Sequence, residues 1–446
     1  MLRKIPLVVI LGSTGTGKTK LSIELAERFG GEIISADSMQ VYKNLDVVTA
    51  KATTAEQARV PHHLLSVCSS AEPFTVVHFR NAALPIIGNL LSNNKIPIIV
   101  GGTNYYIESL LWDFVLGSPQ GETTLDVFNE GNERMFEKLP SDELYNRLRE
   151  IDPLTAKRIH PNNKRKLARA LEVYHTSGIS LSTILAEQRS KPGGNRLGGP
   201  LRYQHVILFS LQCDQEILNN RLDQRVDCML EQGLLEEIRN FYENANVPSG
   251  SNTFTKGILQ TIGLKEFFPY LQKFNRAHDV EILEFLQKRS FVLSDEKSND
   301  EPEGLDLLRI CLKDLKLVTQ RYSKKQIKWV KNRFLGCKDR HTPPLYALNT
   351  TNVAEWNENV YLPAVDVIES YINERIPQLE PLSTIEHPSE GLDEDVSFYC
   401  DICKRHFVGE YQWNSHLKSN KHKRVKDGQR RKLNRENIVG TASKDM

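Results

Sequence analysis

The chain has 446 residues, of which 39% are hydrophobic and 26% charged, and its formal net charge at pH 7 is +2. This profile is typical of a soluble globular protein of two or three domains, and it excludes collagen-like, disulfide-framework and wholly disordered classes. A nearly neutral chain attracts nucleic acid only through local clusters of charge. The cysteines are scattered apart from Cys400 and Cys403, which indicates a reducing compartment. No apolar run reaches the roughly 18 residues of a membrane span, so we expect no membrane partner.

The N-terminal part alternates apolar runs with helical segments. Arg3 and Lys4 precede an apolar stretch that could be mistaken for a signal peptide, but a glycine-rich phosphate motif follows at once and indicates a buried first strand. The alternation predicts an α/β fold with a P-loop NTPase-like parallel sheet. The expected elements are strand 5–11, helix 18–29, strand 32–36, helix 75–93 and strand 96–100.

The middle of the chain interrupts this alternation. Strands disappear between about 116 and 200, where helices are predicted at 141–149 and 164–176, so we expect an inserted helical subdomain. The sheet domain resumes with strand 203–211 and a helix capped by Asp214, whose apolar face is Leu218, Leu222 and Val226. Later expectations are helices to about 335, a solvated loop at 294–304, a strand at 345–348, a helix at 360–376 and an acidic extended linker at 377–395.

Residues 12–19 fit the pattern G-x-x-x-x-G-K-[ST] between a strand and a helix, which is the context that this motif requires. The backbone amides of such a loop surround phosphate oxygens, Lys18 adds a positive charge, and Thr19 can hold Mg²⁺ through its hydroxyl. The alternative is a glycine-rich turn that binds nothing. The predicted diphosphate-binding residues of this loop are Gly12, Ser13, Thr14, Gly15, Thr16, Gly17, Lys18 and Thr19.

A P-loop binds a diphosphate or triphosphate whichever molecule carries it, so the rest of the sheet must indicate the reaction. Strand 96–100 ends in Gly101, Gly102 and Thr103, without the carboxylate that an NTPase usually has there. The carboxylate is Asp37, at the end of the second strand. We expect it to face an acceptor group, with Thr103 opposite. The alternative for Asp37 is a helix cap.

Several motifs coincide in chain order between about residues 5 and 365, and together they resemble the tRNA dimethylallyltransferase family. They lie at 12–19, 35–42, 49–51, 61–64, 101–105, 158–162, 169–173, 260–263 and 319–329.

The resemblance implies that loop 12–19 holds the diphosphate of dimethylallyl diphosphate, and that the dimethylallyl group goes to the exocyclic amine of the adenosine just 3′ of the anticodon. Asp37 would accept the amine proton as the C–N bond forms. Lys18, the loop amides and Mg²⁺ on Thr19 would stabilise the charge that grows on the leaving diphosphate. Thr103 would hydrogen-bond near the leaving oxygen or near the acceptor, and both readings stay open.

Arg221 and Arg225 lie at i and i+4 on one predicted helix face and could clamp the diphosphate with their guanidinium groups. The alternative is a solvated face that pairs with Asp223 or Glu216. The histidine pair at 62–63 also matches the family pattern, with either a structural or a catalytic role.

Two clusters of cations are predicted to contact RNA phosphates. One has six cations within residues 157–169, namely Lys157, Arg158, Lys164, Arg165, Lys166 and Arg169, and by resemblance residues 165–169 lie against the anticodon stem. The other recurs at helical spacing from Arg321 onward, and Ile327, Val330 and Phe334 are expected on the buried side. Solvated helix faces are the alternative for both clusters. The residues expected at the tRNA are Asp37, Ser38, Met39, Gln40, Thr103, Arg165, Lys166, Leu167, Ala168, Arg169, Arg321 and Lys325.

The C-terminal segment contains Cys400, Cys403, His416 and His422 at the spacing of a tetrahedral Cys2His2-type zinc site. A unit of about 25 residues cannot fold without metal or partners, so Zn²⁺ is the expected cofactor here. The gap between the two histidines resembles that of fingers that bind structured RNA.

Phe407 and Trp413 fall where such fingers keep their core hydrophobes. Between Lys418 and Arg435 the chain has nine cations against one aspartate, which predicts a tail that binds phosphates without sequence preference. The expected domains are 1–115 and 201–376 for the α/β core, 116–200 for the insertion, 377–395 for the linker, 396–424 for the finger and 425–446 for the basic tail.

These features favour a monomeric tRNA dimethylallyltransferase whose partners are the tRNA anticodon stem-loop and dimethylallyl diphosphate. We expect it in the cytoplasm, with mitochondrial and nuclear pools left open. Three alternatives share part of the pattern: an adenylate isopentenyltransferase that uses a free nucleotide, a P-loop kinase of a small molecule, and a noncatalytic RNA-binding protein that kept an inactive P-loop.

Overall fold

The computed structural model describes residues 4–113, 136, 138–195, 197–245, 254, 257–289, 291, 300–337, 339–385 and 396–442, with side chains up to 431. The chain forms two compact units. The first combines the residues up to 113 with 201–385, and the second combines 114–200 with 386–446. No described helix has the length and hydropathy that a bilayer span requires.

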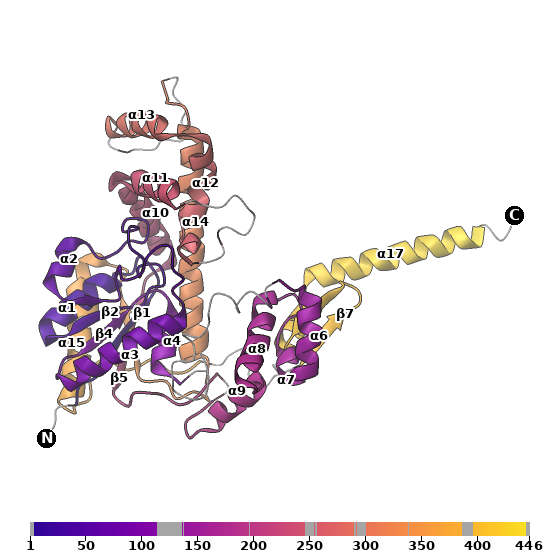
Figure 1. Cartoon of the computed structure of the whole chain (residues 1–446), viewed down its shortest axis with the longest axis horizontal. Helices are drawn as coiled ribbons and strands as arrows, with labels where there is room; N and C mark the ends of the chain where they lie inside the picture. The colour runs from indigo at the N-terminus through magenta and orange to yellow at the C-terminus, as the bar shows by residue number, and fades with distance from the viewer. Residues whose placement is uncertain are drawn as a thin grey trace. The chain divides into compact units, whose positions relative to one another are not determined.

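The first unit is built on a six-stranded parallel sheet with the strand order β3-β2-β4-β1-β5-β6 (Figure 1). Val9 of the central strand pairs with Ile99 on one side and Leu208 on the other, and all three are buried, as in parallel sheets covered on both faces. The predicted α/β fold class is confirmed. The strands are β1 (Leu7–Gly12), β2 (Glu32–Ser35), β3 (His62–His63), β4 (Pro97–Val100), β5 (Val206–Gln212) and β6 (Leu345–Asn349).

Helices that follow the strands complete the sheet layer. Buried side chains of α1, α15 and the central strands form one continuous core. The predicted helix 360–376 is too long, because α15 ends at Ile372 and a π-helical turn, η5, precedes it. The helical elements of this layer are α1 (Lys18–Phe29), α2 (Thr54–Arg59), α3 (Val76–Ser92), α4 (Asn104–Leu111), η4 (Val353–Glu355), η5 (Asn357–Tyr361) and α15 (Leu362–Ile372).

A second core lies among the helices that follow β5. The predicted apolar face of Leu218, Leu222 and Val226 is buried, and a buried ion pair between Arg239 and Asp279, 2.7 Å apart, joins α11 to α13. These helices are α10 (Gln215–Glu231), α11 (Leu234–Asn244), η2 (Gly257–Gln260), α12 (Leu264–Lys273), α13 (Arg276–Gln287), the long α14 (Leu305–Val330) and the π turn η3 (Lys331–Leu335).

Two segments that we predicted to be a solvated loop and an extended linker make specific contacts in the parts that the structure describes. At the end of the predicted loop 294–304, the Glu301 carboxylate lies 2.6 Å from Arg309 and is almost completely buried. In the predicted linker 377–395, Leu382 N–H donates to Leu345 O at 2.7 Å and Ile385 N–H donates to Leu335 O at 3.0 Å. The first part of that segment therefore lies on the body and is not a free linker, because it carries a single carboxylate, Glu380, and its backbone is hydrogen-bonded to the body. Residues 386–395 lie outside the described part.

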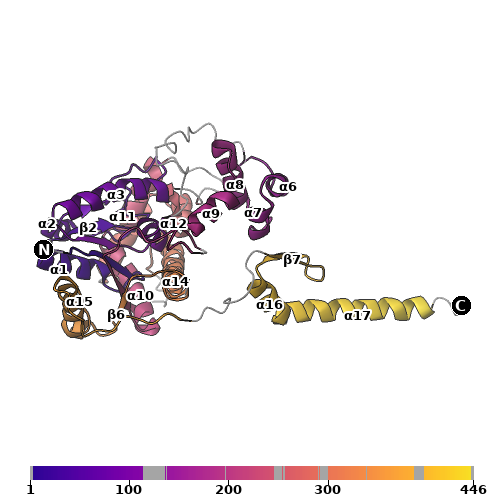
Figure 2. The same cartoon turned by 90° about the horizontal axis from the view of Figure 1, so that it is seen from below.

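The second unit contains a small helical core and the C-terminal module. Leu144, Leu148, Leu167 and Leu171 are buried together in the helical core. The helices are α6 (Ser141–Ile151), α7 (Pro153–Arg158), α8 (Lys164–Ser177) and α9 (Leu181–Ser190); the module has β7 (Ser397–Cys400), β8 (Arg405–Val408), α16 (Glu410–Lys418) and α17 (Asn420–Ala442). In Figure 2, α17 is the long yellow helix, so the predicted basic tail is helical as far as it is described.

Candidate active site

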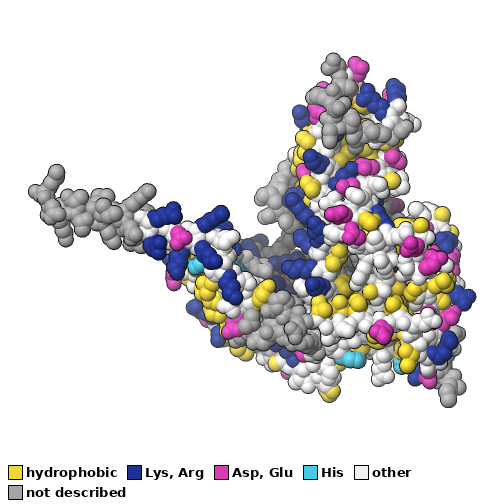
Figure 3. All heavy atoms as spheres, turned by 180° about the vertical axis from the view of Figure 1, so that it is seen from behind, with side chains coloured by type: hydrophobic (Ala, Val, Ile, Leu, Met, Phe, Trp, Pro, Cys, Tyr) yellow, Lys and Arg dark blue, Asp and Glu magenta, His cyan; other side chains and the backbone are white. Residues whose placement is uncertain are grey.

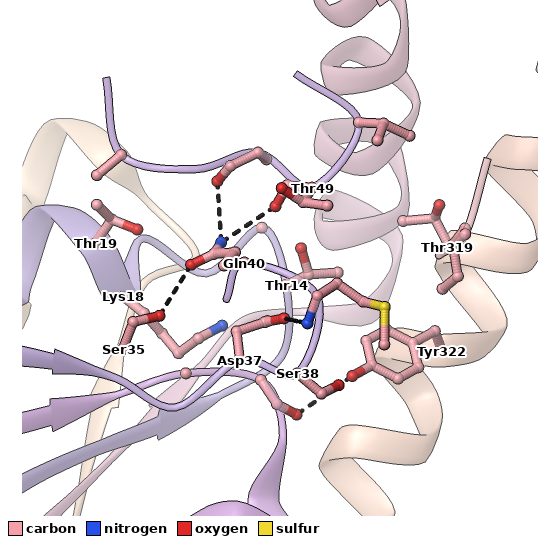
Figure 4. Close-up of a pocket in the computed structure, with 18 of the residues that line it drawn as sticks. Thr14, Lys18, Thr19, Ser35, Asp37, Ser38, Gln40, Thr49, Thr319 and Tyr322 are labelled. Atoms are coloured by element: carbon pink, nitrogen blue, oxygen red, sulfur yellow. Dashed lines mark hydrogen bonds between the residues drawn. The ribbon is translucent and has the colours of Figure 1, made fainter. Parts of the chain in front are cut away.

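The carboxyl ends of β1, β2 and β4 open into a cavity of about 440 Å³, the edge at which open α/β sheets bind ligands (Figure 4). The P-loop, the segment after β2, and helices α10 and α14 form its walls. Its polar lining consists of Thr14, Lys18, Thr19, Ser22, Ser35, Asp37, Ser38, Gln40, Thr49, His62, Arg225, Gln260, Thr261, Thr319, Tyr322 and Gln326.

The P-loop has the backbone that its glycines predict. Gly15 and Gly17 have φ values of +83° and +85°, in the left-handed region that side chains disfavour. A Cβ atom on Gly17 would also lie 2.8 Å from the Trp356 ring. Lys18 Nζ donates to Ser13 O at 2.8 Å, which holds the ammonium group over the loop.

Two cations meet at this loop. Arg225 Nη1 donates to Thr14 Oγ1 at 3.1 Å. Burial lowers the pKa of Lys18 to about 8, an effect that Asp37 opposes and Arg225 reinforces. Lys18 remains partly exposed to solvent through the cavity. The lowered pKa therefore reflects partial desolvation by the surrounding protein and not complete burial. Burial also lowers the pKa of Arg225. Neighbouring, partly buried cations are stabilised by an anion, so this end of the cavity is suited to a diphosphate.

Arg221 does not line this cavity, and the prediction of a paired clamp is wrong for it. Its Nη1 donates to Thr350 O at 2.7 Å and its Nη2 to Thr351 O at 2.6 Å, in the turn after β6. Residues at i and i+4 share a helix face, but they lie about 6 Å apart along the axis. That separation is enough for Arg225 to reach the P-loop while Arg221 braces a neighbouring turn.

Asp37 enters the cavity from the end of β2. Its Oδ1 accepts from Met39 N–H at 2.9 Å, and the segment that follows forms turns, so Asp37 does not cap a helix. Thr103 does not line the cavity but lies behind Ser38. Its Oγ1 accepts from Ser38 N–H at 2.9 Å and donates to Ser38 Oγ at 3.1 Å. In this structure Thr103 fixes the turn that presents Asp37.

Gln40 also lies in the cavity wall, but its amide is used within the protein. Its Nε2 donates to Thr49 O at 3.1 Å and to Ala50 O at 3.2 Å, and Ser35 Oγ donates to its Oε1 at 3.2 Å. These bonds fold the segment around residues 49–50 over the cavity, as Figure 4 shows. Met39 lines the cavity as well, where its sulfur accepts from Thr261 Oγ1 at 3.2 Å.

Helix α14 contributes residues that sequence reasoning missed: Thr319, Tyr322 and Gln326 all line the cavity. Their spacing of three and four positions was the available signal. Burial, with a smaller contribution from the Asp37 charge, raises the pKa of Tyr322, which stays a neutral phenol. Ile327, predicted to be buried, is 42% exposed, and the buried positions nearby are taken by polar Ser323 and Gln326.

The C-terminal module brings its four predicted ligands together. One ligand atom from each of Cys400, Cys403, His416 and His422 lies within 4.8 Å of the others. His422 Nδ1 is 3.4 Å from Cys403 Sγ and 3.1 Å from His416 Nε2. Two thiols and two imidazoles within this space fit a tetrahedral Zn²⁺ site.

The finger is stabilised by aromatic contacts around this site. The ring of Phe407 stacks on His416 with centroids 4.0 Å apart, and Trp413 stacks on Phe398 at 5.1 Å. Phe407 is buried, whereas Trp413 is half-buried. The two predicted core residues therefore both pack, but one of them remains partly open to solvent.

Comparison with known proteins decides the family. The IPP transferase model matches residues 40–333. The chain belongs to the IPP transferase family. Residues 5–65 also match the isopentenyl transferase family, and 397–423 match zinc-finger double-stranded RNA-binding domains.

Relatives in this family cover almost the whole chain. The chain is 42% identical to the tRNA dimethylallyltransferases of Mus musculus and Homo sapiens, over 94% of its own length and 85% of theirs. It is 31% identical to that of Saccharomyces cerevisiae, over 97% of its length and 96% of the relative. The crystal structure of a eukaryotic dimethylallyltransferase acting on tRNA superposes with a TM-score of 0.78 at 28% identity, covering 98% of this chain and 100% of that one.

The cation clusters of this IPP transferase family member are partly exposed. Arg165 and Lys166 on α8 are exposed, but Leu167 and Ala168 are buried in the helical core, so their side chains do not face a ligand as predicted. A helix that presents one face to RNA buries the opposite one. Arg169 is partly exposed, with Nη1 3.6 Å from Glu172.

Further cations lie on α14 and α17. Arg321, Lys324, Lys325 and Lys328 are exposed on α14. Figure 3 shows Lys and Arg side chains gathered along the C-terminal helical arm, where Lys421, Lys423 and Arg424 are among the exposed residues. Both surfaces have the charge that RNA phosphates require.

Proposed function

We propose that the chain transfers the dimethylallyl group from dimethylallyl diphosphate to the exocyclic amine of the adenosine 3′-adjacent to the anticodon in tRNA, and releases diphosphate. One observation carries this proposal: a carboxylate, Asp37, shares one cavity with the P-loop residue Lys18 and with Arg225 of α10, two cations suited to a diphosphate. The related proteins that cover almost the whole chain are tRNA dimethylallyltransferases, in agreement with this chemistry.

The proposed reaction exchanges one bond at the allylic carbon. The C–O bond to diphosphate breaks, the C–N bond to the adenine amine forms, and the amine proton passes to Asp37. An adenine amine is a weak nucleophile because its lone pair is delocalised into the ring, so a positioned proton acceptor accelerates the step. Lys18, Arg225 and the loop amides meet the negative charge that grows on the leaving diphosphate.

Residues with hydroxyl groups, Thr19, Ser22 and Ser35, line the cavity, and hard cations such as Mg²⁺ prefer oxygen ligands. We propose that Thr19 holds the ion. When bound with diphosphate, Mg²⁺ would neutralise part of the charge on the leaving group. In the finger, Zn²⁺ would be held by Cys400 with its three partner ligands, and its role there is structural.

We propose that the exposed cations of α8, α14 and the C-terminal arm bind the tRNA backbone while the cavity receives the target base. The base must leave its stack to reach Asp37, which costs a few kcal/mol that backbone contacts can offset. The adenylate isopentenyltransferase alternative needs neither these surfaces nor a double-stranded RNA-binding finger. The kinase alternative is disfavoured because this chain has no carboxylate at the tip of β4, where Gly101 and Gly102 follow the strand.

The test is an incubation of the full chain with dimethylallyl diphosphate and total tRNA, followed by nucleoside analysis. Prenylated adenosine in tRNA is expected, together with equimolar diphosphate. Prenylated AMP in a parallel incubation with free nucleotide, without modified tRNA, would support the adenylate enzyme instead. Phosphate transfer from ATP to a small molecule would support a kinase, and an inert protein that binds tRNA would support the noncatalytic reading.

A further inference from the structure

Helix α14 carries one buried side-chain amide whose hydrogen bonds connect two sides of the cavity. Gln326 is 4% exposed. Its Oε1 accepts from Thr14 N–H at 2.9 Å, and its Nε2 donates to Gly102 O at 2.9 Å. These partners fix the orientation of the amide, because Thr14 N–H can only donate and Gly102 O can only accept. A buried amide without such partners would destabilise the fold, and both of its ends are satisfied.

The two partners belong to the two halves of the proposed reaction. Thr14 lies in the P-loop, where its hydroxyl receives a hydrogen bond from Arg225. Gly102 precedes Thr103, which holds the turn that presents Asp37. The contact on this side is close, since a Cβ atom on Gly102 would lie 2.4 Å from Gln326 Nε2 and 3.3 Å from Asp37 Oδ2.

The Gln326 amide also joins the two loops beyond the point at which strands β1 and β4 stop pairing. Strands β1 and β4 are neighbours, and their last aligned pair is Ile10 with Val100. Beyond this pair the P-loop and the Gly101–Gly102 turn leave the ladder. Gln326 accepts from the first and donates to the second, as a peptide group of an added strand would do. A side chain from a third element, α14, therefore connects the two loops.

We propose that Gln326 is a positioning residue, which holds the diphosphate loop and the Asp37 turn at the separation that prenyl transfer requires. This inference rests on the proposed function. The P-loop determines where the leaving group lies, and Asp37 determines where the attacking amine lies. A displacement of about 1 Å between reacting groups can cost about 100-fold in rate while each substrate still binds. Gln326 therefore acts on the transfer step and not on either affinity.

The first experiment compares Gln326→Met with Gln320→Met in the full chain. Gln320 is a matched control, because it lies on the same helix and its Nε2 donates to Asp223 at 2.8 Å, away from the cavity. Single-turnover prenyl transfer should fall about 10- to 100-fold in Gln326→Met. The dissociation constants for dimethylallyl diphosphate and for tRNA should stay within about threefold of those of the control.

The second experiment uses Gln326→Glu and a pH series. An ionised carboxylate can still accept from Thr14 N–H but cannot donate to Gly102 O, whereas the protonated carboxyl group can do both. The transfer rate of this variant, divided by the wild-type rate at each pH, should therefore rise as the pH falls. An added negative charge near Asp37 would also slow transfer, so Gln326→Met, which removes both hydrogen bonds without adding a charge, is measured at the same pH values. Gln326→Glu keeps the size of the side chain, so it also serves if Gln326→Met does not fold.

Three results would overturn the proposal: a transfer rate of Gln326→Met within threefold of the control, a loss of affinity that accounts for the whole loss of rate, or a pH-independent ratio for Gln326→Glu. Failure of the proposed function is a separate outcome, because the wild-type chain itself would then form no prenylated tRNA.

Discussion

The zinc finger and the cavity are both sites where four or more polar side chains converge, but they are assembled in different ways. The finger ligands lie between Cys400 and His422, a separation of 22 positions, on one hairpin and the helices that follow it. In the cavity, Thr14 bonds to Gln326 across a separation of 312 positions. A local site is disrupted by the loss of one ligand, whereas a distributed site depends on several elements that each have another role.

The largest expected effect tests the chemistry of the distributed site. Asp37→Asn should lower the single-turnover rate by about 10²- to 10⁴-fold, because an amide cannot accept the amine proton. Equilibrium binding of dimethylallyl diphosphate and of tRNA should change little, since the side chain keeps its size and its bond from Met39 N–H. A variant that transfers at the wild-type rate at saturating substrates would remove Asp37 from the reaction.

The two arginines of α10 are expected to have different roles, because Arg225 lines the cavity and Arg221 does not. Arg225→Met should weaken binding of dimethylallyl diphosphate about 10- to 100-fold, the usual range for loss of a hydrogen bond to a charged group. Arg221→Met should leave donor binding within a few fold but lower the melting temperature, because Thr350 O and Thr351 O lose their donors. Isothermal titration and thermal unfolding measure the two effects. Equal losses of donor affinity would contradict this assignment.

The pH dependence of donor binding tests the charge of the P-loop. Lys18 has its pKa lowered to about 8, so its charge is lost as the pH rises through that value. Affinity for dimethylallyl diphosphate should fall by about tenfold between pH 7 and pH 9, and this fall should be absent in Lys18→Met.

The lowered pKa of Lys18 also affects stability, which should rise with pH where the affinity for dimethylallyl diphosphate falls. The unfolded chain binds the lysine proton up to its ordinary pKa of 10.5, so the unliganded protein should gain stability as the pH rises from about 8 toward that value. Denaturant unfolding without substrate, compared between wild type and Lys18→Met, measures this gain. A wild-type curve parallel to that of the variant would show that Lys18 keeps its charge.

The smallest expected effect on the maximal rate concerns the local site. Cys403→Ser should prevent zinc binding and unfold the finger, because one of the four ligands is lost. The Michaelis constant for tRNA should rise several-fold while the maximal rate stays within a few fold, since we propose that the C-terminal module supplies a second contact with the same RNA. Zinc analysis and steady-state kinetics at about 150 mM salt measure both. An unchanged Michaelis constant would give the finger another partner.

Much of the fold was predictable because its signals are short in range. The buried strand before the P-loop, the glycines within it and the helix after it agree on one structure over residues 7–29. The finger was predictable for the same reason, since ligand spacing alone determines whether a metal can be held. The ends of helices and strands were harder to predict. Helix α15 stops at Ile372, because the exposed residues that follow would bury no further apolar surface by continuing the helix.

The tertiary structure decided which side chains each motif actually presents. Arg221 and Arg225 are equivalent on a helical wheel, and only the positions of the 350–351 turn and the P-loop distinguish them. Thr103 matches its family motif, but it holds Ser38 instead of lining the cavity. Gln326 lies at helical spacing from Thr319 and Tyr322, but that spacing does not show that its face is buried against the P-loop and the Gly102 turn. Sequence determines local geometry through short-range bonds, whereas the use of a side chain depends on which distant backbone atoms the fold places within about 3 Å of it.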